Sequence, residues 1–378
     1  MRFLDIFAGI GGFRLGMEMA GHECVGYVEW DDFARRSYEA IHDTKGEWTW
    51  YDVSTIDYRD IPRAECWTFG FPCQDISIGG KQEGFRGNRS SQFFAVTKRL
   101  RQIKEWDSEK LPSFLFIENV KNFLSVNNGW DFLTAQIELD EIGYNLEWDV
   151  LNSRNFSVPQ NRERVFIIGH LRGRSTRKVF PLENSNRSIG KDIKILAHRD
   201  GYRRNTQVYD IDGSVEAIDT AQGGGRGPHV LVVGNVNPSG NGVNGKVYDS
   251  KGLSPTLTTN KGEGPKVMIK EATKKGYKVA ELGDSINLSV IGSKTRRGRV
   301  GKGVANTLDT SCNQGVLTRD SDIRKLTPLE CFRLQGFPDW AYDRAAAVNS
   351  DSQLYKQAGN SVTVNVIYEI AKRLETQE

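Results

Sequence analysis

The sequence lacks several features that would assign it to a membrane, secreted or metal-binding class. Its 378 residues contain no apolar run of about eighteen residues, so we expect no transmembrane helix. Five cysteines are few and odd in number, which argues against a disulfide framework and favours a cytoplasmic protein. There is no CxxC pair and no histidine–cysteine cluster, and we therefore expect no metal. The first residues begin a folded pattern and do not resemble a signal peptide.

The net charge of +3 is too small to identify a partner by itself. Lysine and arginine nevertheless outnumber acidic residues strongly between Leu171 and Arg204. Such a basic stretch can contact the phosphates of a nucleic acid, and it can equally be a solvated loop. The charge pattern alone leaves both interpretations open.

Residues 1–170 alternate short apolar runs with longer amphipathic stretches. The apolar runs predict strands at Phe3–Ala8, Cys24–Trp30, Cys66–Phe71, Phe114–Ile117 and Val165–Gly169. Between the first two runs, apolar residues from Phe13 to Ala20 recur at helical spacing. This alternation predicts an α/β fold with a mostly parallel sheet and helices on both faces. Ligands of such sheets bind at the carboxyl ends of the strands.

The composition changes from residue 171 to 322, where Gly, Asn, Ser and Thr become dense. A degenerate repeat runs through this stretch, since Val208-Tyr209-Asp210 recurs as Val247-Tyr248-Asp249 and a looser third copy spans Arg299–Val316. Short β-prone runs between glycine-rich turns predict repeated hairpins. We therefore expect a smaller, mainly β domain at 171–322.

Helical character returns at Thr327. The residues Thr327-Pro328-Leu329-Glu330 predict a helix start with a capping box, and Val362–Leu374 predicts a final amphipathic helix. We expect a connecting segment at 323–348 and, at 349–378, a return of the chain to the first domain.

Two early motifs point to a ligand at the ends of the first strands. The turn Gly9-Ile10-Gly11-Gly12 allows close approach of a ligand to the backbone and opens a helix whose N–H groups are free to bind it. The third glycine of a dinucleotide-binding fingerprint is missing from this turn, because Arg14 occupies its position. This difference argues against a nicotinamide or flavin cofactor. Glu29 follows the next strand, where an acid commonly binds ribose hydroxyls.

Three further motifs offer catalytic groups at strand ends. Cys73, after Pro72, could act as a nucleophile if its thiolate is stabilised. Glu118 closes another strand and could donate a proton. Arg162 and Arg164 alternate with Glu163, so an extended segment would direct both guanidiniums to one side. Taken singly, each of these residues is as well explained by a structural role.

The order of these motifs resembles that of the DNA cytosine-C5 methyltransferases along the whole chain. The blocks, in order, are Phe7-Ala8-Gly9-Ile10-Gly11, Glu29, Pro72-Cys73-Gln74, Glu118-Asn119-Val120, Gln160-Asn161-Arg162-Glu163-Arg164, a variable region and Gly359-Asn360-Ser361-Val362. The variable region lies where that family has its target-recognition domain. Two positions depart from the family pattern: Tyr51-Asp52-Val53 stands where Gly-Asp-Ile is more common, and Gly79 stands where some relatives carry a serine.

The resemblance implies a fold, a cofactor and site residues. The fold is the Rossmann-like α/β fold of S-adenosylmethionine-dependent methyltransferases, with a smaller, mainly β target-recognition domain. S-adenosylmethionine, and its product S-adenosylhomocysteine, would contact Phe7, Gly9, Gly11, Glu29, Asp52, Val53, Asn360, Ser361 and Val362. The catalytic set would be Cys73 as the nucleophile, Glu118 as the acid at the cytosine ring, and Arg162 and Arg164 as its supports.

The resemblance also implies sequence-specific action on double-stranded DNA. The Cys73 thiolate would add to C6 of a flipped-out cytosine, and C5 would then take the methyl group. Candidates for contact with DNA are Ser77, Lys81, Arg86, Arg89, Arg226, Arg296, Arg297, Arg299, Thr307 and Leu308. For most of these arginines a phosphate contact is more common than a base contact.

Three alternative functions would each be recognisable from features of the sequence. An amino-methyltransferase would carry an Asp/Asn/Ser-Pro-Pro-aromatic motif, but the chain has no Pro-Pro pair. A relative that methylates transfer RNA would not need the long repeat-bearing region, and an inactive DNA-binding protein would not keep the whole catalytic set. We expect a monomer that acts either beside a cognate restriction endonuclease or as a solitary bacterial or phage enzyme.

Overall fold

The computed structural model describes most of the chain. The described residues are 1–71, 91–182, 266–289, 295–318 and 323–375, together with the backbone of four short strands between 195 and 248. Cys73 and the residues that follow it up to position 90 lie outside the described residues.

The contacts divide the chain into two compact units. Unit 1 comprises Met1–Asn186, Thr307–Cys312 and Thr327–Glu378, and unit 2 comprises Arg187–Asn306 and Asn313–Leu326. Thr307–Cys312 therefore belongs to unit 1 although its neighbours on both sides in the sequence belong to unit 2. The domain boundaries expected from composition stay a prediction, because compactness alone does not define a target-recognition domain.

Unit 1 is built on a seven-stranded sheet with the strand order β3-β2-β1-β4-β5-β8-β6. Its strands are β1 (Arg2–Ile6), β2 (Glu23–Val28), β3 (Trp48–Trp50), β4 (Cys66–Phe69), β5 (Phe114–Val120), β6 (Tyr144–Asn152) and β8 (Glu163–Leu171). β8 runs antiparallel to β5 and β6, whereas the pairs from β3 to β5 are parallel. The mostly parallel sheet is thus confirmed, as are all five predicted strands.

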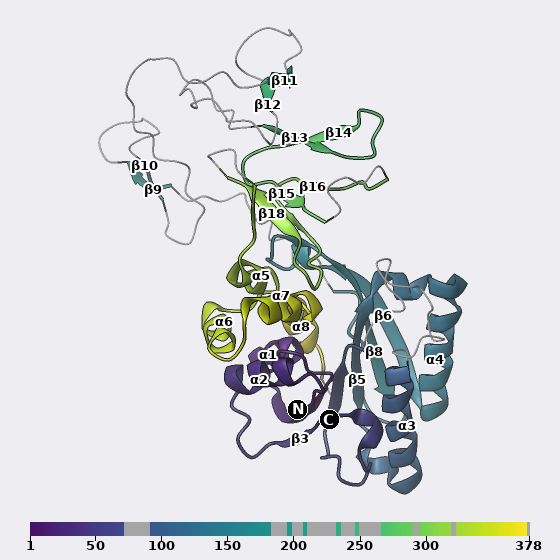
Figure 1. Cartoon of the computed structure of the whole chain (residues 1–378). Coiled ribbons are helices and arrows are strands. Elements are labelled where there is room, and N and C mark those ends of the chain that lie inside the picture. Colours follow the sequence, from purple (N-terminus) through teal and green to yellow (C-terminus); the bar gives the residue numbers. More distant parts are fainter. Residues whose placement is uncertain are drawn as a thin grey trace. The chain divides into compact units, whose positions relative to one another are not determined.

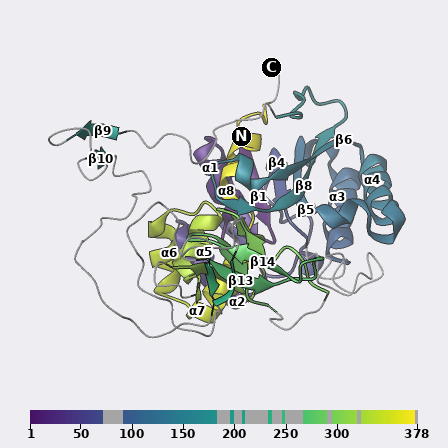
Figure 2. The same cartoon turned by 90° about the horizontal axis from the view of Figure 1, so that it is seen from above.

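Helices cover both faces of this sheet. Helices α1 and α8 pack on one face, and α3 and α4 pack on the other (Figures 1 and 2). The helices of unit 1 are α1 (Gly12–Met19), α2 (Asp32–Ile41), α3 (Ser91–Trp106), α4 (Trp130–Ile142), α5 (Pro328–Leu334), α6 (Asp339–Ala346), α7 (Asp351–Asn360) and α8 (Val364–Ala371). No helix among the described residues is long and apolar enough to cross a membrane.

The apolar run of β5 explains why the sheet is buried on both sides. Phe114 and Phe116 belong to the core beneath α1 and α8, while Leu115 and Ile117 belong to the core beneath α3 and α4. Successive side chains of a strand point to opposite faces, so a strand with two covered faces must be apolar throughout.

The C-terminal segment Thr327–Glu378 belongs to unit 1. Helix α5 begins with a capping box, in which Glu330 N donates to Thr327 Oγ1 at 3.2 Å and Thr327 N donates to Glu330 Oε2 at 2.8 Å. The predicted final helix is present as the shorter α8, and Ile367 and Ile370 of α8 share a core with Phe13 of α1.

The described residues of unit 2 form short strands. They are β9 (Ile195–His198), β10 (Gln207–Tyr209), β11 (Val232–Asn235), β12 (Lys246–Tyr248), β13 (Val267–Lys270), β14 (Tyr277–Ala280), β15 (Ser285–Asn287), β16 (Val300–Gly301), β17 (Ala305–Asn306), β18 (Gln314–Leu317) and β19 (Ile323–Lys325). In both clear copies of the repeat, the Val-Tyr pair lies in the second strand of an antiparallel pair, β9–β10 and β11–β12. The β character expected of this stretch therefore holds for its described residues, and the antiparallel pairing at both clear copies agrees with repeated hairpins.

Gly16→Ala is expected to destabilise unit 1. The added Cβ would lie 2.6 Å from Ile367 Cβ and 2.9 Å from the Val364 carbonyl oxygen, so α1 and α8 would have to separate. Overpacking costs about 1–3 kcal/mol, and the helix propensity gained by alanine offsets about 1 kcal/mol of it. Thermal unfolding followed by circular dichroism should give a lower Tm.

Met19→Ala is the matched control, because Met19 is exposed on the same helix. It should change the free energy of unfolding by less than about 0.5 kcal/mol. An unchanged Tm for Gly16→Ala would contradict the close contact between α1 and α8.

Candidate active site

The motifs predicted from the sequence converge on one edge of the sheet. β1, β2, β4 and β5 run parallel and end at this edge. β8 runs the other way and begins there, so that Arg164 lies opposite Val120 in the antiparallel register. The edge therefore combines the last residues of the parallel strands with the first residues of β8, and it is the usual place for a ligand in an open α/β sheet.

The turn after β1 has an unusual backbone. Phe7, Gly9 and Gly11 all have positive φ, at 55°, 58° and 83°. Such a conformation is uncommon for a residue with a side chain, and it is often found at functional sites. A Cβ on Gly9 would meet nothing within 4 Å, so open space lies in front of the turn. Gly9 thus leaves room for a ligand against the backbone, whereas the place of a Cβ on Gly11 is taken by the His42 ring.

Glu29 is buried beside this turn and holds it in place. Its Oε2 accepts from Gly9 N at 2.7 Å, and its Oε1 accepts from Asp31 N at 2.8 Å. Burial raises the pKa of Glu29, and the two N–H donors oppose that rise. Each carboxylate oxygen keeps a lone pair for a further donor.

Asp52 and Val53 follow β3. Asp52 Oδ1 accepts from Ser54 N at 2.8 Å and caps the short 3-10 helix η1 (Val53–Thr55), while the Val53 side chain is buried in the core. Asp52 thereby fixes the direction in which the chain leaves β3.

The turn between α7 and α8 packs directly against the glycine-rich turn. A Cβ on Gly12 would lie 2.7 Å from Ser361 Oγ and 2.9 Å from Val362 Cγ2. Ser361 and Val362 are buried, and Asn360 is exposed. The structure therefore brings together the first and the last motif of the chain, which are about 350 residues apart in a sequence of 378.

The end of β4 leads to the predicted nucleophile. Asn119 Nδ2 donates to the Phe71 carbonyl oxygen at 3.3 Å, and its Oδ1 accepts from Val120 N at 2.8 Å. Asn119 thus ties the residue two positions before Cys73 to β5. Cys73 itself lies outside the described residues.

Glu118 forms an ion pair with Arg164 across β5 and β8. Arg164 Nε lies 3.0 Å from Glu118 Oε1, and both side chains are largely buried. The other carboxylate oxygen, Oε2, lies 3.1 Å from the point where a Cβ of Gly70 would be. One oxygen of Glu118 is therefore held by a cation, while the other lies beside the end of β4.

Arg162 has a different environment from Arg164. Its Nη2 donates to the carbonyl oxygens of Ser361 at 2.9 Å and Gly359 at 3.3 Å, and its Nη1 donates to that of Leu308 at 3.3 Å. In the described structure Arg164 contacts Glu118, whereas Arg162 donates to backbone carbonyls of distant segments. The support of Glu118 by Arg162 stays a prediction.

The candidates for DNA contact fall into two groups. Ser77, Lys81, Arg86, Arg89 and Arg226 lie outside the described residues. In unit 2, Arg297 is exposed and its Nε donates to the Ala272 carbonyl oxygen at 2.7 Å, and Arg296 is half-buried. Thr307, in unit 1, is exposed, and its Oγ1 donates to the Asn161 carbonyl oxygen at 2.9 Å.

Two of these candidates require a correction. Arg299 is buried within unit 2, where its guanidinium donates to the carbonyl oxygens of Asn287 and Lys270, and burial lowers its pKa. The Leu308 side chain is buried in unit 1. Because neither side chain faces solvent, both have a structural role in the described fold.

Sequence reasoning missed three residues of this edge. Trp30 is 65% exposed next to Glu29, Asn119 ties Phe71 to β5, and Gln160 is fully buried against Leu308. An exposed tryptophan at a strand end is a recognisable signal, since large apolar side chains are rarely exposed without a partner. Asn119 and Gln160 belong to two of the motif blocks named above, but no local pattern indicates their contacts, because their partners lie far away in the chain.

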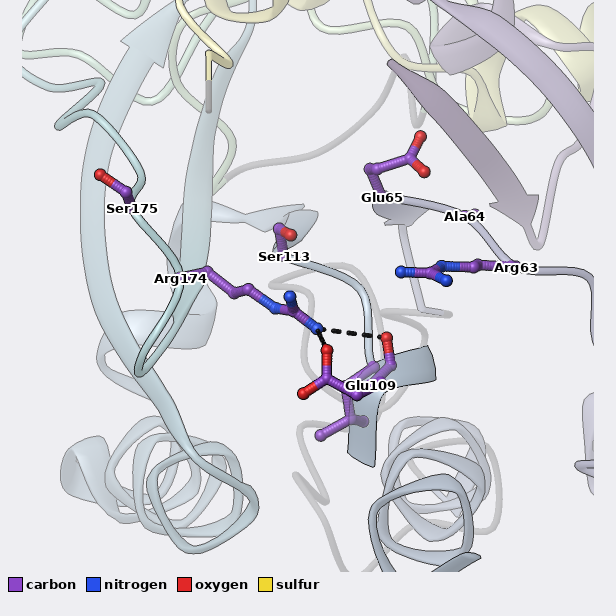
Figure 3. Close-up of a pocket in the computed structure, with 8 residues that line it drawn as sticks. Arg63, Ala64, Glu65, Glu109, Ser113, Arg174 and Ser175 are labelled. Carbon is purple, nitrogen blue, oxygen red and sulfur yellow. Dashed lines mark hydrogen bonds and ion pairs between the residues drawn. The ribbon is translucent and has the colours of Figure 1, made fainter. Parts of the chain in front are cut away.

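Two cavities lie at the opposite edge of the sheet. One, of about 260 Å³, is lined by residues that include Arg63, Glu65, Ser113 and Arg174, and the Arg174–Glu109 ion pair crosses it (Figure 3). Glu65 and Ser113 immediately precede β4 and β5, which identifies this as the amino edge. A second cavity, of about 430 Å³, lies beside the first residues of β6. Neither contains a residue of the motifs described above.

Comparisons with known proteins agree on one family. Residues 1–376 match the family described as C-5 cytosine-specific DNA methylase. The orphan methyltransferase M.SPRI of Bacillus phage SPR is 34% identical, with 99% of this chain and 97% of that protein covered. The type II methyltransferase M.HhaI of Haemophilus parahaemolyticus is 31% identical, with 98% and 93% covered. This chain belongs to the C-5 cytosine-specific DNA methylase family.

Membership of the family confirms the enzyme class predicted from the motifs. The protein is a DNA (cytosine-5-)-methyltransferase, and the family implies S-adenosylmethionine as its methyl donor. The solved structure of the Dnmt2 methyltransferase of S. pombe is similar to this chain with a TM-score of 0.50 at 18% identity, with 98% of this chain and 97% of that one covered. That likeness concerns the fold, and it agrees with the predicted Rossmann-like architecture.

Asp5 gives this edge a pH-dependent stability. It lies fully buried in β1, where burial raises its pKa to about 8 even though Thr68 Oγ1 donates to it at 3.0 Å. Between its ordinary pKa of 3.8 and about 8, the folded protein keeps a proton that the unfolded chain releases. The contribution of Asp5 to the stability therefore falls as the pH rises through this window.

Asp5→Asn removes this titration. We expect the Tm of Asp5→Asn relative to the parent to rise steadily from about pH 5 to about pH 8. The exposed control Asp60→Asn should shift the Tm by an amount that does not depend on pH. A Tm difference that stays constant for Asp5→Asn would show that Asp5 ionises normally in the folded state.

Proposed function

We propose that this methyltransferase methylates C5 of a cytosine flipped out of double-stranded DNA, through a covalent adduct with Cys73. The observation that carries the proposal is the Glu118–Arg164 ion pair beside Gly70, where β4 leads toward the cysteine. One pyrimidine ring could thus meet the Glu118 carboxyl group, the Arg164 guanidinium and the end of β4, which leads to Cys73.

The residues at the carboxyl ends of β1 and β2 fit S-adenosylmethionine. The open space at Gly9 admits a ligand, the free lone pairs of Glu29 can accept from ribose hydroxyls, and exposed Trp30 offers a flat face to an adenine ring. When bound, S-adenosylmethionine supplies an electrophilic methyl group. The other residues proposed for the pocket are Phe7, Gly11, Asp52, Val53, Asn360, Ser361 and Val362.

Covalent geometry limits the position of the proposed nucleophile. Two residues of chain span at most about 7 Å, so Cys73 cannot lie farther than this from Phe71, which Asn119 ties to β5 next to Glu118. The thiolate is the reactive form, and a free cysteine has a pKa near about 8.5, so the site must stabilise the anion. The sequence after Cys73 carries Lys81 and Arg86, whose positive charges would favour the thiolate if they approach it.

Addition of the Cys73 thiolate to C6 breaks the C5–C6 double bond and makes C5 nucleophilic. Glu118, in its acid form, donates a hydrogen bond to N3 of the ring and so stabilises the negative charge that develops there. C5 then forms a bond to the methyl carbon while the methyl–sulfur bond breaks. Loss of the C5 proton to a base and departure of the thiolate from C6 restore the aromatic ring.

Arg164 is the proposed positioning residue for Glu118. By holding Oε1 it fixes the rotation of the carboxylate, which leaves Oε2 on the side of β4 from which the nucleophile comes. A preorganised carboxylate does not have to reorient during the reaction, and this lowers the barrier.

Double-stranded DNA is the proposed partner. A base inside the stack exposes neither C6 nor C5 to a thiolate and a methyl donor on opposite sides, so the cytosine must leave the helix. The candidates that remain for contact with DNA are Ser77, Lys81, Arg86, Arg89, Arg226, Arg296, Arg297 and Thr307. The related proteins include orphan phage enzymes and type II enzymes, and we propose a role in DNA protection that is compatible with either setting.

DNA that contains 5-fluorocytosine at the target position should trap a covalent adduct. Fluorine cannot leave as a proton, so elimination stops after methyl transfer and the Cys73–C6 bond persists. Denaturing gel electrophoresis should reveal a protein–DNA species that depends on S-adenosylmethionine. Cys73→Ser should abolish the adduct and reduce kcat by at least about 1,000-fold.

The control for this experiment is Cys331→Ala, which removes a buried cysteine in α5. It should keep the adduct. Full adduct yield with Cys73→Ser would overturn the assignment of the nucleophile.

The Glu118–Arg164 pair should act as a unit. Glu118→Gln is expected to lower kcat by about 10²–10⁴-fold, and Arg164→Met should also lower it, because the carboxylate loses its fixed orientation. Since both changes affect the same group, the double variant should lose less than the product of the two single effects.

Lys121→Met is the matched control, because Lys121 and Glu163 form an exposed ion pair of 3.0 Å at the same edge of the sheet. It should change kcat less than about twofold. Multiplicative losses in the Glu118–Arg164 cycle would mean that the two side chains act independently.

A further inference from the structure

Gln160 and Arg162 form a buried polar cluster between β7 (Gln160–Asn161) and β8. They are 0% and 3% exposed. A buried guanidinium is costly unless it is hydrogen-bonded, so its partners are an essential part of the fold. The segments that supply these partners come from distant parts of the sequence, so the cluster connects regions that are otherwise separate along the chain.

The cluster holds the segment Thr307–Cys312. Gln160 Oε1 accepts from Leu308 N at 3.2 Å, and Arg162 Nη1 donates to the Leu308 carbonyl oxygen at 3.3 Å. Both backbone polar groups of one residue are therefore bound by the same cluster. In the sequence this segment lies between two parts of unit 2, within the region predicted to read DNA. The cluster therefore attaches part of that region to unit 1.

The same guanidinium also holds the turn after α7. Arg162 Nη2 donates to the carbonyl oxygens of Gly359 at 3.3 Å and Ser361 at 2.9 Å. Ser361 packs on Gly12 of the glycine-rich turn, where a Cβ would lie 2.7 Å from Ser361 Oγ. One side chain thus connects the segment around Leu308 with the wall of the proposed cofactor pocket.

We propose that Arg162 is a positioning residue that couples occupancy of the S-adenosylmethionine pocket to the placement of Thr307–Cys312 and thereby to binding of target DNA. The inference rests on the proposed function, because it uses the proposed pocket and the proposed partner. Coupling of this kind is reciprocal: the ligand that orders one segment also favours the arrangement that the other ligand requires.

The geometry explains why an arginine is needed. Its planar guanidinium directs Nη1 and Nη2 to different acceptors at the same time. A lysine at this position would keep the charge, but its single ammonium group could not span the carbonyls of Leu308 and Ser361 in the observed arrangement. Arg162→Lys therefore tests the connection without removing the positive charge.

The coupling is measurable by calorimetry. We would determine the Kd of S-adenosylhomocysteine for the full-length protein alone, and again with a saturating duplex that carries the target cytosine, identified by bisulfite sequencing of DNA from expressing cells. The ratio of the two values is the coupling factor. We expect a factor of at least about five for the parent protein and a value close to one for Arg162→Lys.

Arg154→Lys is the matched control, since Arg154 is an exposed arginine eight positions earlier, in η6 (Ser153–Asn155). It should keep the coupling factor of the parent. Circular dichroism and the Tm establish whether each variant is folded. A parental coupling factor in folded Arg162→Lys, or a factor of one in the parent, would overturn the proposal.

If Arg162→Lys does not fold, Thr307→Val tests the same coupling. It removes the hydrogen bond from Thr307 Oγ1 to the Asn161 carbonyl oxygen at the surface, so it loosens the same segment with little risk to the core. We expect a reduced coupling factor. If Thr307 only contacted DNA, affinity for the duplex would fall equally with and without S-adenosylhomocysteine, and the unchanged factor would contradict the proposal.

Different results would refute the proposed function and the proposed role of Arg162. A parent protein that binds neither S-adenosylhomocysteine nor the duplex, and forms no adduct with 5-fluorocytosine, would refute the proposed function. A parent that binds both and forms the adduct, with a coupling factor that Arg162→Lys leaves unchanged, would refute only the role of Arg162.

Discussion

The antiparallel direction of β8 is the constraint on which the site depends. β1, β2, β4 and β5 end at one edge of the sheet, and β8 begins there, in a register that pairs Val120 with Arg164 and Glu118 with Phe166. Only this reversal allows a guanidinium from the start of one strand to meet a carboxylate from the end of its neighbour, at 3.0 Å. A parallel β8 would carry Arg164 to the amino edge, where the cavity of Figure 3 lies.

The carboxyl edge is stabilised by contacts between the two ends of the chain. The turn after α7 packs on Gly12 without room for a Cβ, and α8 packs on α1 at Gly16. The glycines of the first motif therefore serve two purposes. Gly9 and Gly11 adopt backbone conformations that favour glycine, whereas Gly12 and Gly16 permit close packing. The cofactor pocket proposed for this enzyme thus depends on the last helix as much as on the first strand.

Buried polar groups hold together segments of this fold that are distant in the sequence. Asp5 is buried in β1 and titrates near pH 8, Arg162 binds carbonyls of distant segments, and Arg299 does the same within unit 2. Such groups are costly to bury, and each is retained together with specific partners. The arginines predicted as site residues therefore fall into two groups. Arg162 and Arg299 are buried and bind backbone carbonyls, whereas Arg297 is exposed.

The sequence alone determined the local elements, because hydrophobic period, capping residues and turn residues act over a few positions. The strand of Phe114, the capping box at Thr327 and the repeated Val-Tyr hairpins followed from such patterns, and the order of motifs was sufficient for the family. Only the tertiary structure decided that Arg164 meets Glu118 while Arg162 holds Leu308, and that Leu308 is buried. Alternation along a strand indicates which face a side chain takes, but the partner on that face is supplied by segments up to about 200 residues away, whose approach no local pattern encodes.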